Sequence, residues 1–253
     1  MAAEVKDLVG KCEVCAELKE NQTREPLMTH MIPDRPWNKI ALDLFTLEGK
    51  DYLISVDYYS DFWELDRLHS TTTAAVTAKL KPHFARWGIP EEIVTDNGRQ
   101  FVSDEFAEFA GLWEFRHVTS SPFYSRSNGK AESAVKIAKR LLKKSKLSGN
   151  DFHKALLDWR NTPTVDMDSS PAQRLMSRRT RGTLPISKEL LKPSIVDDVP
   201  EKIKRKRQRA KLAHDKHARQ LPELDIGQPV YVKPLPDRKE PWQRGTLIEK
   251  LST

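Results

Sequence analysis

Three acidic side chains are the residues of this sequence best suited to chemistry. Asp43 lies inside the apolar run Ile40–Phe45, Asp96 ends the run Glu92–Asp96, and Glu132 lies near the start of a helical pattern, with 35 residues between Asp96 and Glu132. An ionised carboxylate among apolar neighbours is costly unless it is paired or binds a metal. Hard oxygen ligands suit Mg²⁺ or Mn²⁺ and not zinc. The set predicts a divalent-cation site, and two such ions can activate an attacking oxygen and stabilise a leaving oxygen at a phosphodiester.

Simpler explanations exist for each carboxylate. The alternative for Asp43 is a strand position that faces solvent, although its neighbours leave little polar face to share. For Asp96 it is ordinary turn chemistry, because Asp followed by Asn-Gly is common in turns. Asp57 has nearly the same apolar surroundings as Asp43, and we predict a structural hydrogen-bonding role for it.

The helix that begins near Glu132 carries a stripe of lysines. At 100° per residue, Glu132 and four lysines fall close to one line along the helix, namely Lys136, Lys139, Lys143 and Lys146. One carboxylate cannot neutralise four lysines, and like charges at this spacing destabilise an isolated helix. Phosphates along the stripe would remove that repulsion, so we predict contact with nucleic acid. The alternative is a solvated helix face.

The net charge of +7 over 253 residues is concentrated in two blocks. Residues 128–147 have a net charge of +6 and residues 197–220 of +5, which leaves −4 for the rest. Basic blocks on a near-neutral body favour polyanion binding. The run Lys202–Lys211 resembles a nuclear-localisation signal or a DNA-backbone patch, so we expect a nuclear protein; the alternative is a solvated linker helix. No apolar run reaches the roughly 20 residues of a membrane span, so no membrane partner is expected.

The elements that must position these residues follow from periodicity. Strands are predicted at 40–45, 51–59, 62–68, 93–95 and 114–119, and helices at 71–87, 104–112, 128–147, 151–160 and 171–176. Three antiparallel strands followed by alternating helix and strand predict an α/β protein with a mixed five-stranded sheet flanked by helices. A charged helix is predicted at 197–219, and strands at 226–232 and 245–248 predict a small, truncated β-unit.

A family resemblance now follows from the motifs. The three acids, together with Thr95–Gly98, Ser120–Glu132 and Asn161–Pro163, resemble the DDE-type catalytic core of retroviral and gypsy-type retrotransposon integrases. The resemblance implies an RNase H-like fold, two Mg²⁺ (or Mn²⁺) ions, and 3′-end processing and strand transfer on DNA. It implies that Asp43 is shared between the ions, that Asp96 and Glu132 each complete one site, and that Lys130, with Asn128, lies near the DNA end.

The same resemblance predicts the domain organisation. Residues 1–25 resemble a remnant of a zinc-binding N-terminal domain, 34–180 the catalytic core, 195–220 a basic helical linker and 221–253 part of a C-terminal β-barrel. Cys12 and Cys15 resemble half of the family's zinc site, but no histidine precedes Cys12, so we expect no zinc there. The partners implied are the retroelement ends, target DNA and further copies of the chain.

Three functions remain open at this point. The leading hypothesis is an enzyme, an integrase-type DNA strand transferase of retrotransposon origin, supported by the complete set of acids. The second is a catalytically silent or domesticated nucleic-acid-binding protein, suggested by the shortened flanking modules. The third, an RNase H-type nuclease, fits the spacing and the Asn128–Glu132 run less well.

Overall fold

The computed structural model describes residues 4–5, 8–9, 12, 14–15, 26–27, 31–120, 129–216, 218–220, 223–232 and 241–250. The chain forms two compact units. One comprises residues 30–207, and the other combines residues 1–29 with residues 208–253. None of the helices in these described ranges is long and apolar enough to span a bilayer.

The larger unit is built on a five-stranded sheet with the order β3-β2-β1-β4-β5. Strand β1 pairs antiparallel with β2 and parallel with β4, and β5 is parallel to β4. This confirms the predicted mixed sheet. The strands are β1 (Lys39–Leu47), β2 (Lys50–Asp57), β3 (Trp63–Leu68), β4 (Glu92–Thr95) and β5 (Arg116–Thr119). Strand β1 is three residues longer than expected because its pairing with β2 continues to the turn at Glu48 and Gly49, both at positive φ.

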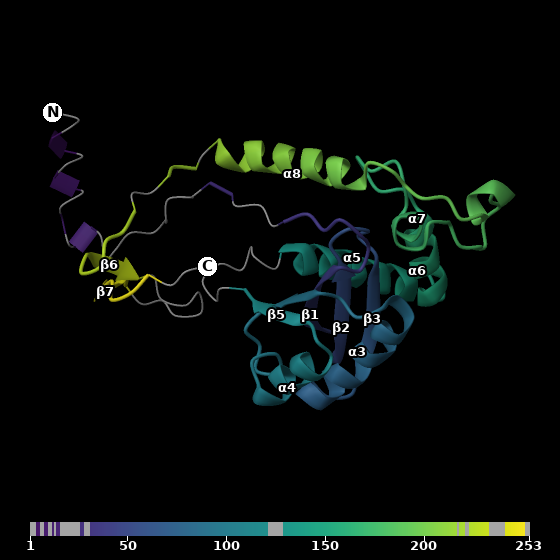
Figure 1. Ribbon diagram of the computed structural model, residues 1–253, viewed down its shortest axis with the longest axis horizontal. Coiled ribbons are helices and arrows are strands. Elements are labelled where there is room, and N and C mark those ends of the chain that lie inside the picture. Colours follow the sequence, from purple (N-terminus) through teal and green to yellow (C-terminus); the bar gives the residue numbers. More distant parts are fainter. Residues whose placement is uncertain are drawn as a thin grey trace. The chain divides into compact units, whose positions relative to one another are not determined.

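Helices cover both faces of this sheet (Figure 1). Helices α3 (Thr73–Trp87) and α4 (Asp104–Leu112) pack on one face. Helices α5 (Gly129–Leu147) and α6 (Phe152–Asn161) cover the other, and α7 (Pro171–Met176) packs against α6. Thr72 caps the start of α3, because its side chain accepts a hydrogen bond from the Ala75 amide.

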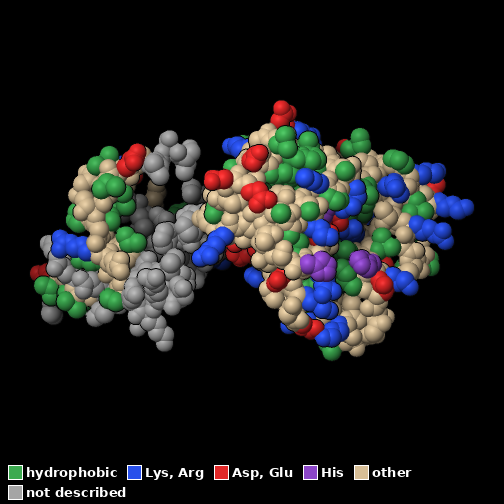
Figure 2. All heavy atoms as spheres, turned by 90° about the horizontal axis from the view of Figure 1, so that it is seen from below, with side chains coloured by type: hydrophobic (Ala, Val, Ile, Leu, Met, Phe, Trp, Pro, Cys, Tyr) green, Lys and Arg blue, Asp and Glu red, His purple; other side chains and the backbone are tan. Residues whose placement is uncertain are grey.

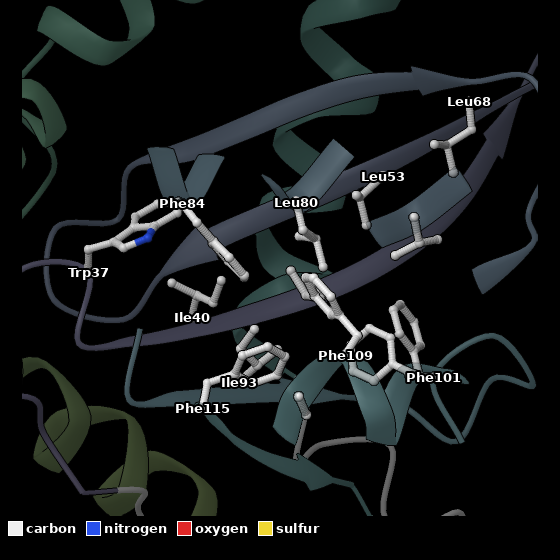
Figure 3. Close-up of a cluster of buried hydrophobic side chains, with 14 residues drawn as sticks. Trp37, Ile40, Leu53, Leu68, Leu80, Phe84, Ile93, Phe101, Phe109 and Phe115 are labelled. Carbon is white, nitrogen blue, oxygen red and sulfur yellow. The ribbon is translucent and has the colours of Figure 1, made fainter. Parts of the chain in front are cut away.

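Alternation along β1 divides the core into two clusters. Ile40 and Leu42 point towards α3 and α4, where they join Leu80 and Phe84 in a cluster rich in phenylalanine (Figure 3). Ala41 and Phe45 point the other way, towards the small residues of α5. Full burial of one such large apolar side chain contributes about 1.5–3 kcal/mol, so both faces of the sheet are fixed by packing.

The charged helix α8 (Val199–Asp215) is shorter than the predicted 197–219 and has an apolar attachment at its start. Val199 and Ile203 are buried against Met167, and Lys202 forms an ion pair with Asp168. The first turns of α8 therefore belong to the larger unit.

The smaller unit contains two antiparallel strands, β6 (Pro229–Val232) and β7 (Gln243–Thr246). They confirm the small C-terminal β-unit. Strand β6 begins three residues later than predicted because Gly227, at φ 89°, forms a turn. Strand β7 begins two residues earlier because Gln243 pairs with Val232.

Candidate active site

The register of the sheet brings two of the predicted acids together. Ala41 of β1 lies opposite Val94 of the parallel strand β4, and Asp43 and Asp96 each follow two residues later. Because side chains alternate along strands and neighbouring strands lie about 4.8 Å apart, both carboxylates lie level on the face that bears Ala41. That face is the one covered by α5.

Glu132 reaches the same region from the first turn of α5. The helix packs on β1 and β2 through Ala131, Ala134 and Ala138, whose side chains are almost completely buried. Small side chains at these positions let the helix approach the sheet closely. Lys139 lies two turns after Glu132, with its Nζ 5.2 Å from the centre of the Phe45 ring.

Electrostatics show that the three acids interact. Burial of the Asp43 carboxylate, followed by the negative charge of Asp96, raises the pKa of Asp43 to about 6. The charge of Glu132 raises this pKa further, while a hydrogen bond from the Leu44 amide and the charge of Lys139 lower it. A bound cation would offset the negative charges that surround Asp43.

Two of these carboxylates also bond to nearby backbone. Asp43 Oδ1 accepts a hydrogen bond of 2.8 Å from the Leu44 amide, and Asp96 Oδ1 accepts one of 3.0 Å from the Gly98 amide. A Cβ atom at Gly98 would lie 3.0 Å from that carboxylate oxygen and would clash with Nε2 of Gln100, so a larger residue would require the Gln100 side chain to move. The Asp-Asn-Gly sequence therefore does form a turn, and the turn holds Asp96.

The donor set suits magnesium or manganese in its chemistry and charge. Within the described ranges, no three His, Cys, Asp or Glu side chains are grouped closely enough to hold one ion together. The family resemblance implies that each ion is held by two carboxylates and not by all three. The grouping expected for one ion is therefore a pair such as Asp43 and Asp96. Asp43 and Asp96 each accept one backbone amide bond through Oδ1, which leaves lone pairs on both carboxylates for a cation.

The other predicted residues occupy different environments. Lys136 and Lys143 are exposed, as a phosphate-binding stripe requires, whereas Lys146 forms an ion pair with Glu48. Lys130 forms an ion pair with Asp61. Asn128 lies outside the described residues. Basic side chains are distributed over much of the larger unit on the face shown in Figure 2, with acidic ones between them.

Asp57 has the predicted structural role. Its side chain is fully buried and accepts hydrogen bonds from the amides of Tyr59 and Ser60 and from the Ser60 hydroxyl. Burial, partly offset by these bonds, raises its pKa. It therefore holds the turn after β2.

Cys12 and Cys15 form no disulfide, and Cys15 is exposed. Its contact with Cys12 raises the pKa of the Cys15 thiol.

Sequence reasoning did not identify Arg174 or Asp61. The Arg174 side chain is fully buried and forms an ion pair with Asp61. The two are 113 residues apart in sequence, and no periodic pattern relates them.

Comparisons with known proteins agree with this architecture. Residues 33–125 match the family described as Integrase core domain. An uncharacterized protein of Caenorhabditis elegans is 29% identical over 255 residues, covering 98% of this chain and 20% of its own length. A transposon Tf2-3 polyprotein of Schizosaccharomyces pombe is 26% identical over 149 residues, covering 55% of this chain and 11% of its own length. This chain thus spans a fifth or less of these relatives.

Among solved structures, a simian T-cell lymphotropic virus intasome in complex with PP2A regulatory subunit B56 gamma has a TM-score of 0.61 at 18% identity, covering 96% of this chain and 81% of its own. The HTLV-2 integrase catalytic core domain in complex with magnesium has a TM-score of 0.48 at 23% identity and covers 56% of this chain and 98% of its own. The first of these likenesses, with the observed strand order, confirms the predicted RNase H-like fold. Residues 33–125 therefore belong to the integrase core domain family of retroviruses and retrotransposons.

Proposed function

We propose that this chain is a metal-dependent polynucleotidyl transferase that processes DNA 3′ ends and joins them to target DNA. One observation carries the proposal: Asp43 lies beside Asp96 and within the electrostatic influence of Glu132, on the sheet face covered by α5. A purely structural acid would be paired with a cation or saturated with hydrogen bonds, as Asp57 is. The charges of Asp96 and Glu132 instead raise the pKa of Asp43.

The metal would be held by Asp43 together with Asp96 on one side and Glu132 on the other. When bound, a pair of such ions activates the attacking oxygen and stabilises the leaving oxygen of a phosphodiester. The protein's own contribution is to hold the acids in place before the ions arrive. The sheet register fixes the two aspartates, the Gly98 turn fixes the second of them, and the alanine face of α5 fixes the helix that carries Glu132.

The protonation state of Asp43 suits this role. With a pKa of about 6 the carboxylate is mostly ionised above pH 7, yet it is less stable in that form than an ordinary aspartate. A cation relieves this cost. Lys139 relieves only part of it, since its charge lowers the pKa of Asp43 without restoring the ordinary value.

DNA would lie along the outer side of α5. Lys136 and Lys143 are exposed there and can each contact a phosphate, which favours a backbone track beginning near the acids. Such contacts are independent of sequence. They weaken as the salt concentration rises, because releasing counterions from the DNA then contributes less free energy.

The deciding experiment measures DNA cleavage and joining on a labelled duplex with Mg²⁺ or Mn²⁺. Asp96→Asn should reduce the rate by at least about 10³-fold and leave DNA binding intact, because electrostatic stabilisation of the transition state is lost. Asp104→Asn is the matched control, since Asp104 is exposed on α4 and makes the same change of charge. DNA binding without any metal-dependent reaction in the unaltered protein would instead establish the catalytically silent alternative.

We also propose nuclear localisation through α8. Lys204, Arg205 and Lys206 are exposed along the helix, while Ile203 is buried. Fusing residues 195–220 to a fluorescent protein, with and without these three basic residues, tests the signal directly. Equal cytoplasmic and nuclear fluorescence for the unaltered fusion would refute it.

A further inference from the structure

Asp61, in the turn between β2 and β3, joins elements that are far apart in sequence. Its Oδ1 accepts a hydrogen bond from Nζ of Lys130, in the first turn of α5. Its Oδ2 accepts a hydrogen bond of 3.1 Å from Nη2 of Arg174, in α7. One carboxylate therefore ties the start of α5 to α7 and to the β2–β3 turn.

The turn that presents Asp61 is itself firmly held. The Asp57 carboxylate binds the amides of Tyr59 and Ser60, and Arg174 Nε donates a 2.9 Å hydrogen bond to the Ser60 carbonyl. Asp61 adopts a left-handed backbone conformation with φ 62°, which Asp tolerates better than most residues. The Arg174 side chain has no exposed surface. Asp61 is thus a fixed point of the larger unit.

Lys130 is bound to this fixed point on several sides. Its Nζ also lies 3.4 Å from the Tyr58 carbonyl and 5.9 Å from the centre of the Tyr58 ring. Only 20% of the Lys130 side chain is exposed. A DNA phosphate would have to displace Asp61 to pair with this lysine, so its contacts are those of an anchor within the protein.

The anchor lies two residues before Glu132. At 100° per residue the two side chains project about 200° apart, so fixing the direction of Lys130 fixes the rotation of the turn that carries Glu132. Glu132 has no hydrogen-bond partner of its own in the described part of the chain, whereas both aspartates bond to backbone amides. Its direction therefore depends on how its helix is held.

We propose that Asp61 is a positioning residue that acts through Lys130, fixing the first turn of α5 so that Glu132 faces Asp43. The inference rests on the proposed function, because it takes Glu132 as a metal ligand. It assigns Lys130 to the protein's own framework and not to the DNA end. Lys136 and Lys143, which are exposed further along α5, remain the proposed contacts to DNA phosphates.

The test uses four variants of the full chain. Asp61→Asn and Lys130→Met break the ion pair, and Asp61→Glu and Lys130→Arg preserve its charges. Because Asp61→Asn leaves the buried Arg174 without its carboxylate, that variant can fail to fold; Lys130→Met keeps the Asp61–Arg174 pair and provides the test in that case. Glu48→Gln is the matched control, since it breaks the exposed pair with Lys146 at the other end of the same helix.

Three quantities distinguish positioning from DNA contact: turnover at saturating DNA, the Mn²⁺ concentration for half-maximal rate, and the dissociation constant for DNA. Loss of a residue that orients a metal ligand typically costs about 10–100-fold in activity or metal affinity. We expect turnover to fall by this factor in both disrupting variants and the Mn²⁺ requirement to rise. DNA affinity should change less than about twofold, and the conservative variants should recover most of the turnover.

The opposite pattern would overturn the proposal. If Lys130 contacts phosphate and Asp61 only competes with it, Asp61→Asn tightens DNA binding, Lys130→Met weakens it, and the Mn²⁺ requirement stays constant. Should the unaltered protein show no metal-dependent reaction, the proposed function fails separately. Amide hydrogen exchange over residues 129–135 then tests whether the Asp61–Lys130 ion pair holds the first turn of α5. Faster exchange in both disrupting variants, but not in Glu48→Gln, supports it, and unchanged exchange refutes it.

Discussion

Replacing Asp43 with asparagine should make the metal-free protein more stable, although it removes a proposed catalytic group. The ionised Asp43 carboxylate is half-buried and faces the charges of Asp96 and Glu132. Asparagine has nearly the same shape and no charge, so it keeps the packing of β1 and removes the repulsion. Stability and function therefore oppose each other at this position.

The size and sign of the effect follow from the pKa. A shift from 3.8 to about 6 corresponds to about 3 kcal/mol between the two protonation states. Partial exposure of the side chain reduces this, and we expect a gain in the free energy of unfolding of about 1–2 kcal/mol at pH 7.5. The folded protein binds this proton more tightly than the unfolded chain does. The penalty on the unaltered protein is therefore absent below pH 4, grows as the pH rises towards 6, and is constant above it.

Urea denaturation in the presence of a chelator, at pH 4 and at pH 7.5, measures the difference. Asp51→Asn provides the matched control, because it makes the same change of charge on the neighbouring strand, where the side chain bonds to Thr46. Added Mn²⁺ should stabilise the unaltered protein more than it stabilises Asp43→Asn, since the intact folded site binds the ion more tightly. Two results would refute the electrostatic explanation. One is an Asp43→Asn variant that is less stable than the unaltered protein at pH 7.5, and the other is a gain in stability at pH 4 as large as the gain at pH 7.5.

Three further predictions follow from the same contacts. Arg174→Met should lower the free energy of unfolding by about 3–5 kcal/mol in urea titrations, because it removes one of the two cations paired with Asp61 and leaves two carbonyls without their buried donor. The exposed Lys192→Met should change the free energy of unfolding little, and a loss below about 1 kcal/mol for Arg174→Met would contradict the buried network. Lys136→Ala and Lys143→Ala should each reduce the slope of log affinity for DNA against log salt by about 1, without affecting turnover at saturating DNA; an unchanged slope would remove these lysines from the DNA track. Mn²⁺ affinity, followed by electron paramagnetic resonance, should fall by about tenfold per pH unit below pH 6, because Asp43 takes up a proton. The weaker Mn²⁺ affinity of Asp43→Asn should lack this pH dependence. An affinity of the unaltered protein that does not change with pH would contradict the role of Asp43 as a ligand.

The local elements of the fold could be predicted from the sequence because their causes are local. Short apolar runs define β1 and β2, Thr72 caps α3, and Gly88, at φ 92°, ends it. Element ends were less accurate where pairing across the chain decided them, as for β7, which begins at Gln243 because Val232 lies opposite.

Asp43, Asp96 and Glu132 could be singled out by residue type and spacing, since a charged group in an apolar run is conspicuous whatever the fold. That the first two lie level followed only from the pairing of Ala41 with Val94, which no local pattern encodes. The same holds for Lys130. The family resemblance implied a DNA contact, whereas the structure shows a lysine already paired with Asp61 and only 20% exposed. Charge can be counted along a chain, but whether a charge is available to a ligand depends on which opposite charge the folded backbone brings to it.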